Sequence, residues 1–128
     1  MADRVKLVRE YEYKRLVLEE FMQGESVILA ADQGIIKYGQ VLAQSTADGK
    51  YYKYDDSGTD GKDLPRRIYK NDEDIETDSI TEEIRAVVLR AGRVNKDLIV
   101  GIDLDNYKGI AELERNGIYL EEVLKNVN

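Results

Sequence analysis

The apolar residues of this chain come in short runs separated by turn residues, and this spacing restricts the fold more than any other feature. Residues 26–30, 40–44 and 84–90 are clear examples. Short apolar runs bounded by glycine and aspartate are typical of β-strands, whereas an amphipathic helix needs apolar residues three and four apart over a longer stretch. We therefore expect a mainly β (α+β) fold, built as a small β-rich barrel.

Two further segments support this prediction. Residues 5–18 alternate imperfectly between apolar and charged residues, which favours an extended segment over a helix. The pair Asp48-Gly49 predicts a hairpin, because these residues readily adopt the positive φ values of a tight turn. Residues 51–54, which contain three tyrosines, are expected to form its returning strand.

One short helix is expected near the C-terminal end of the chain, and a second short helical segment is compatible with the pattern. Asp105 or Asn106 can cap its start, and Asn116-Gly117 can end it with a left-handed residue. Its expected apolar face comprises Tyr107, Ile110 and Leu113. Residues 118–120 then return to a strand.

Composition restricts the chemistry that the chain can perform. With 128 residues it is long enough for one domain, and it contains neither cysteine nor histidine. Disulfides, thiolate metal sites, thiol nucleophiles and the Ser-His-Asp triad are therefore excluded. A net charge of −7 argues against nucleic-acid binding, and no apolar run approaches the length of a membrane span. The start of the sequence lacks the features of a signal peptide, so synthesis in a cytoplasm is expected.

The negative charge is concentrated in residues 48–83, which carry twelve acidic and six basic residues, whereas the rest of the chain sums to −1. The twelve acids are Asp48, Asp55, Asp56, Asp60, Asp63, Asp72, Glu73, Asp74, Glu76, Asp78, Glu82 and Glu83. This segment is also rich in turn residues and poor in apolar ones, so we expect it to face solvent.

Several patterns that could carry chemistry have simpler explanations. Residues 55–63, DDSGTDGKD, suggest a calcium loop, but an EF-hand beginning at Asp56 would need a glutamate where Arg67 stands. A solvated loop is the preferred interpretation, and no metal site is predicted. Two of the three tyrosines of residues 51–54 are expected to cover a core or a subunit contact rather than to stack on a ligand. No phosphate-binding loop is present, so no cofactor is predicted.

The N-terminal segment has two interpretations. An extended segment with β-branched and tyrosine residues can add a strand to the exposed sheet edge of another chain. It can equally be an ordinary first strand of the domain.

Four motifs, in this order, resemble those of lambda-like phage head decoration proteins. Residues 27–43 are similar to the family's apolar strand, glycine turn and "G-x-V-L" strand, and residues 48–54 resemble its "DGKYxxY" hairpin. Residues 86–95 are similar to its "A-x-V-L-x-x-G-x-V-N" strand and turn, and residues 110–118 to its final helix and "GI" strand. The resemblance covers about residues 26–120.

The resemblance implies a structural protein of a phage capsid. Such a protein is a homotrimer that binds the outer surface of the expanded head at three-fold sites and stabilises the lattice of the major capsid protein. Residues 1–22 would be an extended capsid-binding arm, and residues 23–128 a trimerising domain. Leu7, Tyr11, Tyr13 and Val17 share the alternation expected of an added strand and are the candidate capsid contacts. The acidic segment would then face away from the capsid.

A different class of function remains open from the residues alone. An acidic chain always offers carboxylate pairs, so a small carboxylate-based hydrolase or a carbohydrate-binding module is the alternative. An enzyme would hold carboxyl groups with raised pKa values in a concave pocket.

Overall fold

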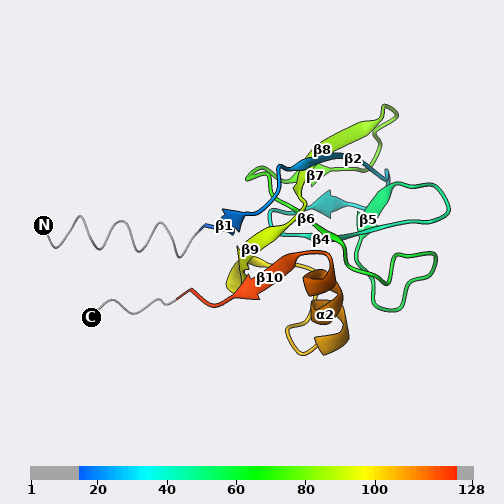
Figure 1. Ribbon diagram of the computed structural model, residues 1–128. Helices are drawn as coiled ribbons and strands as arrows, with labels where there is room; N and C mark the ends of the chain where they lie inside the picture. Colours follow the sequence, from blue (N-terminus) through cyan, green and yellow to red (C-terminus); the bar gives the residue numbers. More distant parts are fainter. Residues whose placement is uncertain (1–14, 124–128) are drawn as a thin grey trace, which may run out of the picture.

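The short apolar runs of the sequence become strands in the computed structural model, which describes residues 15–123 (Figure 1). The elements in this range are β1 (Val17–Glu20), β2 (Glu25–Leu29), β3 (Ile35–Ile36), β4 (Val41–Gln44), β5 (Tyr51–Lys53), β6 (Arg67–Tyr69), β7 (Ile75–Glu76), β8 (Ile84–Leu89), β9 (Gly92–Asn95), the 3-10 turn η1 (Lys96–Leu98), α2 (Tyr107–Arg115) and β10 (Ile118–Glu121).

Five of these strands form a closed barrel in the order β2-β5-β4-β6-β8. The longest pairing joins β2 and β8, which are antiparallel from Glu25 opposite Val88 to Leu29 opposite Ile84. A separate sheet has the order β1-β9-β10, and β3 pairs with β7. The predicted fold class is confirmed, with one α-helix and one 3-10 turn beside the barrel. Of the predicted arm, only residues 15–22 lie within the described range.

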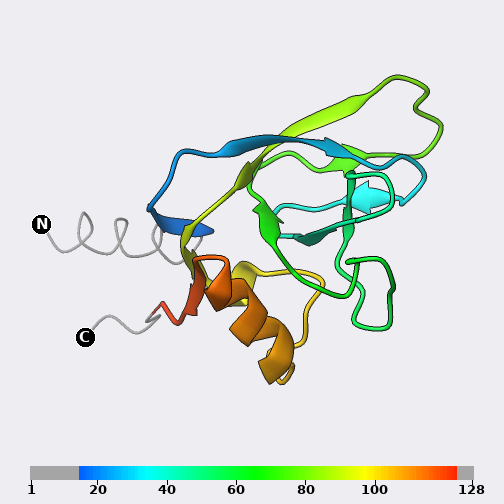
Figure 2. The ribbon, with the colours of Figure 1, turned by 45° about the vertical axis from the view of Figure 1, so that its right-hand side comes forward.

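Neighbouring residues of three barrel strands belong to two different apolar clusters. Leu42, Tyr69 and Val88 belong to the cluster inside the barrel. The residues beside them in sequence, Val41, Ile68 and Leu89, point to the opposite face, because side chains alternate along a strand. These outer residues pack with Leu16, Val94, Leu113 and Ile118 in a second cluster. The second cluster therefore attaches α2 and the β1-β9-β10 sheet to the barrel (Figure 2).

A buried ion pair lies on the inner face of the barrel wall. The side chain of Arg67 is only 7% exposed, and its Nε lies 3.0 Å from Oε1 of Glu25. Arg67 also donates from Nη1 to the carbonyl oxygen of Arg66 at 2.9 Å. Burial raises the pKa of the nearby Tyr51 hydroxyl. A buried arginine is tolerated in a structure only when its donors find acceptors, and both contacts meet that requirement.

A glutamine side chain extends the pairing of β2 with β5, which is the shortest strand pairing of the barrel and is called the seam below. The parallel strands β2 and β5 share one register pair, Leu29 opposite Tyr51. Beyond that pair, Nε2 of Gln33 donates to the carbonyl oxygens of Ala30 at 2.9 Å and Tyr51 at 3.2 Å. Oε1 of Gln33 accepts from the amide of Lys53 at 2.8 Å. The side chain thus supplies the hydrogen bonds that a continued ladder would have made.

The helix begins and ends where the sequence predicts. The side chain of Asn106 accepts a hydrogen bond from the amide of Gly109 at 2.9 Å, and Gly117 takes φ of +85° after the C-cap Asn116. Leu113 is fully buried, but the placement of Tyr107 on the buried face is wrong, because Tyr107 is 77% exposed. At about 100° per residue, Tyr107 lies about 120° around the helix from Leu113.

The structure also adds features that the sequence did not predict. The hairpin between β4 and β5 is confirmed, but Gln44 pairs with Tyr51, so its loop is longer than a tight two-residue turn. Gly49 still takes φ of +76°, and the carboxylate of Asp48 accepts from the amide of Lys50. The short strand β7 lies within the acidic segment. Among the described residues, no helix has the length and apolar character needed to cross a membrane.

Replacing Gln33 tests the role of the seam. The substitution Gln33→Ala removes three hydrogen bonds from a partly buried site and should lower the free energy of unfolding by about 1–3 kcal/mol. Gln44→Ala is the matched control, because it removes one exposed hydrogen bond to Gly49. Urea denaturation of both variants makes the comparison, and an equal loss in the two would contradict the role of Gln33.

Candidate functional site

Both ends of the described chain leave from the same end of the β1-β9-β10 sheet (Figures 1 and 2). Val17 of β1 and Leu120 of β10 both pair with Val94 of β9, from opposite sides. Strand β1 is antiparallel to β9 and β10 is parallel to it. The chain before β1 and the chain after β10 therefore depart together, about 10 Å apart, which is two strand spacings.

Residue Leu16 fixes the point at which the N-terminal segment joins the domain. Its side chain is fully buried in the second apolar cluster. Its amide donates to the hydroxyl of Tyr38 at 3.0 Å, and its carbonyl oxygen accepts from the amide of Asn95 at 2.8 Å. At the other end of β1, Lys70 forms an ion pair with Glu20. Contacts from three separate segments thus hold β1 in place.

Arg93 connects all three strands of this sheet. From the central strand β9 its guanidinium reaches Glu121 of β10 through two bonds, Nε to Oε1 at 2.8 Å and Nη2 to Oε2 at 2.6 Å. Its Nη1 reaches Oε1 of Glu19 on β1 at 2.9 Å. The hydrogen bond from Arg93 holds the pKa of the Glu121 carboxyl below its usual value. The hydrogen bonds that Arg93 donates to Glu121 and Glu19 raise the pKa of its guanidinium.

Large apolar side chains are exposed beside this ion-pair network. Phe21 is 49% exposed, Met22 46% and Tyr119 42%. The rings of Phe21 and Tyr119 lie with centroids 6.3 Å apart, tilted by 55°. An aromatic pair at the edge of a sheet, next to a charged network, is the composition expected of a protein interaction surface.

Close packing between β1 and β9 depends on Gly92. A Cβ placed on this residue would lie 2.2 Å from the carbonyl oxygen of Glu19. The register between the two strands also shifts between Val17 and Glu19, which marks a β-bulge. The first strand can therefore approach β9 closely only where β9 has no side chain.

Of the four predicted contact residues, Val17 alone lies within the described range. Leu7, Tyr11 and Tyr13 lie outside the described residues. Val17 lies in β1 and packs against the second apolar cluster. Sequence reasoning missed Arg93 and Glu121, because no local pattern indicates which distant strands will pair.

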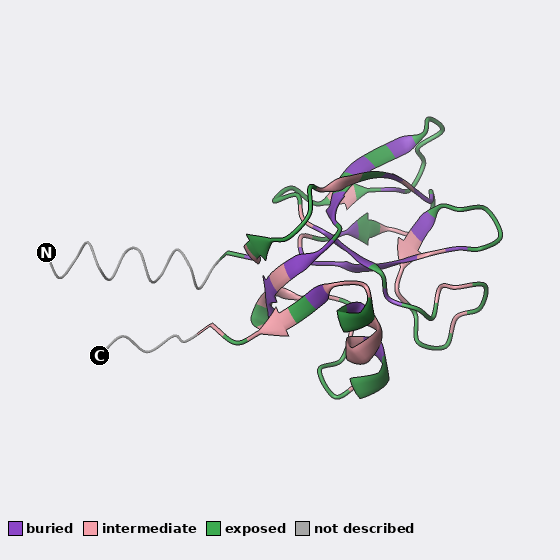
Figure 3. Ribbon diagram, viewed as in Figure 1, coloured by how far each residue is buried: buried purple, intermediate pink, exposed green. Residues whose placement is uncertain are grey.

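The acidic residues of the segment 48–83 are exposed, although β5 and β6 within it contribute to the core. All twelve of its aspartates and glutamates are exposed to solvent, as the outer loops of Figure 3 illustrate. Tyr51 lies in the core, as expected for one residue of the tyrosine strand, whereas Tyr54 packs against the second cluster. Tyr52 lies under the amine of Lys62, 4.2 Å from its ring centroid, and donates its hydroxyl to Asp48.

The loop of residues 55–63 holds its own hydrogen bonds. Oδ1 of Asp55 accepts from the amide of Ser57 at 3.0 Å and from its hydroxyl at 2.8 Å, and these bonds lower the pKa of the Asp55 carboxyl. In residues 15–123, no three carboxylates are grouped so that they could hold a metal ion.

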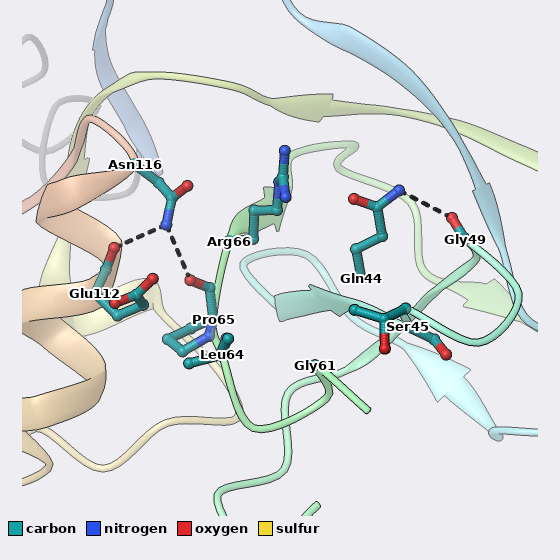
Figure 4. A pocket seen from close by; sticks show the side chains of 10 residues that line it. Gln44, Ser45, Gly49, Gly61, Leu64, Pro65, Arg66, Glu112 and Asn116 are labelled. Atoms are coloured by element: carbon teal, nitrogen blue, oxygen red, sulfur yellow. Dashed lines mark hydrogen bonds between the residues drawn. The ribbon is translucent and has the colours of Figure 1, made fainter. Parts of the chain in front are cut away.

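A groove of about 430 Å³ lies between α2 and the barrel (Figure 4). Its one carboxylate, Glu112, accepts from Nη1 of Arg115 at 2.8 Å. Within residues 15–123, three carboxyl groups have clearly shifted pKa values, Asp48, Asp55 and Glu121, and in each the shift is downward. These groups favour their charged forms at neutral pH, which is the opposite of what a general acid needs.

The chain is a β-rich domain in which a three-stranded sheet is attached to a small closed barrel. Comparison with models of protein families identifies the family to which this domain belongs. Residues 19–118 match the model of the bacteriophage lambda head decoration protein D family. The match covers most of the chain, so the chain belongs to this family. Its members are structural proteins of the phage capsid, and membership implies association with the capsid and a location in the virion. A search of curated protein sequences gives no match.

The Arg93 network makes the sheet sensitive to acid. Because the pKa of folded Glu121 is depressed, its contribution to stability is present above the ordinary value of 4.5 and is lost as the pH falls through the folded-state pKa. The melting temperature of Arg93→Gln should therefore lie below that of the unmodified chain at neutral pH, and the difference should shrink in acid. Arg85→Gln is the control, because it removes an exposed ion pair within one segment. A pH-independent difference for Arg93→Gln would contradict this account.

Substituting Gly92 tests the close approach of β1. In Gly92→Ala the new methyl group clashes with the backbone of Glu19, so β1 must move. We expect amide hydrogen exchange in β1 to accelerate at least tenfold while the barrel strands keep their protection. Gly49→Ala is the control for backbone strain remote from β1, since Gly49 takes φ of +76°, which an alanine rarely adopts, whereas a Cβ there meets no atom within 4 Å. Unchanged protection of β1 in Gly92→Ala would refute the argument.

Proposed function

We propose that this chain binds the outer surface of the expanded phage head at three-fold sites as a homotrimer and stabilises the capsid lattice. Membership of the head decoration family supports this proposal. The observation that carries the more detailed mechanism is the fixed root of the N-terminal segment at Leu16, together with the exposed pair Phe21 and Tyr119 toward the other end of β1. The proposal assigns the chain no catalytic step, cofactor or nucleic-acid partner.

The proposed contact with the major capsid protein is strand addition. Residues 1 to about 22 form the arm, and residues 23–128 form the trimerising domain. An arm that adds a strand to a capsid-protein sheet gains affinity from backbone hydrogen bonds and specificity from alternate side chains. Leu7, Tyr11 and Tyr13 would supply those side chains. Val17 lies where the arm enters β1, so its side chain would connect the added strand to the second apolar cluster.

The orientation of the domain follows from charge and from the position of the arm. The sheet that holds both described ends would face the shell. The acidic segment of residues 48–83 would face away, because its exposed carboxylates would be costly to bury without partners.

Stabilisation of the lattice would follow from binding alone. A partner that binds only the expanded lattice stabilises that state by about 2.7 kcal/mol per site when its free concentration is about 100 times the dissociation constant. Many such sites on one shell would together resist disassembly. A decoration protein therefore needs no covalent chemistry, which agrees with a chain that has no cysteine or histidine.

Truncation tests the arm directly. Deleting residues 2–14 should abolish binding to expanded capsids and leave the melting temperature and oligomeric state of the domain unchanged. The deletion stops at Lys14 because Leu16 belongs to the second apolar cluster, and its loss would damage the fold. Capsid co-sedimentation measures the binding. A truncated protein that decorates capsids with unchanged affinity would refute the arm.

A pair of full-length variants distinguishes strand addition from nonspecific binding to the capsid. Substituting serine for Leu7, Tyr11 and Tyr13 should weaken capsid binding at least tenfold. Substituting serine for Lys6, Glu10 and Glu12, which have the opposite parity, should weaken it much less. Equal effects of the two triple variants would contradict the strand.

A further inference from the structure

The groove between α2 and the barrel contains an arginine whose charge is not neutralised by an ion pair. Figure 4 shows Arg66 between Gln44 on one side and Asn116 on the other. Arg66 is exposed, and within residues 15–123 its side chain has no recorded ion pair or hydrogen bond. The arginines with ion pairs are Arg67, Arg85, Arg93 and Arg115.

Three of the other polar side chains of this groove already have partners. Nε2 of Gln44 donates to the carbonyl oxygen of Gly49 at 3.1 Å, and Nδ2 of Asn116 donates to that of Glu112 at 2.8 Å. Glu112 itself is held by Arg115. The exposed Leu64, 51% accessible, lines the groove beside Pro65. The groove therefore offers one free guanidinium next to an apolar side chain, which fits an incoming carboxylate on a protein chain.

A cluster of acids lies at the opposite end of the same strand. Arg66 immediately precedes β6, and the turn that follows β6 contains Asp72, Glu73 and Asp74. All three are exposed, and Oδ1 of Asp74 accepts from the amide of Tyr38 at 3.0 Å. Along an extended chain this turn lies roughly 15–20 Å from Arg66, too far for the two to meet within one molecule.

We propose that the Arg66 groove of one copy receives the acidic turn of residues 72–74 from a neighbouring copy. This contact rests on the proposed homotrimer and identifies the surfaces that form it. A ring of identical subunits requires a heterologous contact, in which two different patches of one molecule meet. A concave patch with a free arginine and a protruding acidic turn, located at opposite ends of β6, meet that requirement.

Charge balance favours this pairing. Each copy carries a net charge of −7, so three copies repel one another unless opposite charges meet locally. Arg66 is available for such a pairing without breaking any ion pair of its own chain. Guanidinium–carboxylate contacts also fix the orientation of the partners, because they are often bidentate.

A charge exchange tests the contact on the full chain. Arg66→Glu alone, and Asp72→Lys with Glu73→Lys alone, should each weaken trimer assembly at least tenfold, because each places like charges in contact. The variant that combines all three substitutions should restore assembly, since every contact in the ring is then complementary again. Arg90→Glu, at an exposed site outside the groove, should assemble as the unmodified chain does. Light scattering over a concentration series measures assembly, and circular dichroism checks that each variant folds.

A cysteine pair gives a second, independent readout. The chain has no cysteine, so Gln44→Cys together with Asp72→Cys creates a bond only between copies, because the two positions are too far apart within one chain. Mild oxidation should produce a covalent trimer from the double variant and no covalent trimer from either single variant.

Three results would overturn the proposal: a chain that cross-linking shows to be monomeric on expanded capsids as well as in solution, Arg66→Glu that assembles normally, or a combined variant that remains as weak as its parents. Failure of the unmodified chain to bind expanded capsids would instead count against the proposed function.

Discussion

The structure depends on three barrel strands that are apolar on both faces. In β4, β6 and β8 one residue packs inside the barrel and its neighbour packs outside it, as Leu42 and Val41 illustrate. The inner cluster closes the barrel, whereas the outer cluster gives α2 and the β1-β9-β10 sheet a surface to pack against. A polar substitution at an outer position such as Ile68 would therefore weaken the packing of the sheet against the barrel while leaving the barrel interior intact.

This arrangement connects the proposed N-terminal arm to the domain. The chain passes from β8 into β9 through two residues, so Leu89 of the barrel and Val94 of the sheet lie in the same cluster. Leu16 joins that cluster from β1, and Arg93 ties β1 to β10 on the exposed face. A force applied to the proposed arm by a bound partner would therefore be transmitted to the barrel through packed side chains and an ion-pair network. Such a connection is what a capsid stabiliser needs.

Local patterns in the sequence predicted the elements well and their partners poorly. The hairpin at Asp48-Gly49 and the helix capped by Asn106 are determined by nearby residues, so both were predictable. The hydrogen bonds of Gln33, by contrast, depend on where β5 lies. Strand β7 was not predicted because acidic residues surround its two positions. Pairing of Arg93 with Glu121 follows from a parallel register between distant segments, which single-sequence reasoning cannot supply. The exposed acidic segment was predictable, because charge and turn residues coincide there.

A cryo-electron microscopy map of decorated, expanded capsids tests the central claim most directly. The account predicts density for three copies at each three-fold site, with the β1-β9-β10 sheet facing the shell and an added strand from the arm on a capsid-protein sheet. It also predicts that the loops of residues 48–83 face away from the shell. Density in which those acidic loops contact the capsid, or in which the arm contacts none of it, would contradict the account.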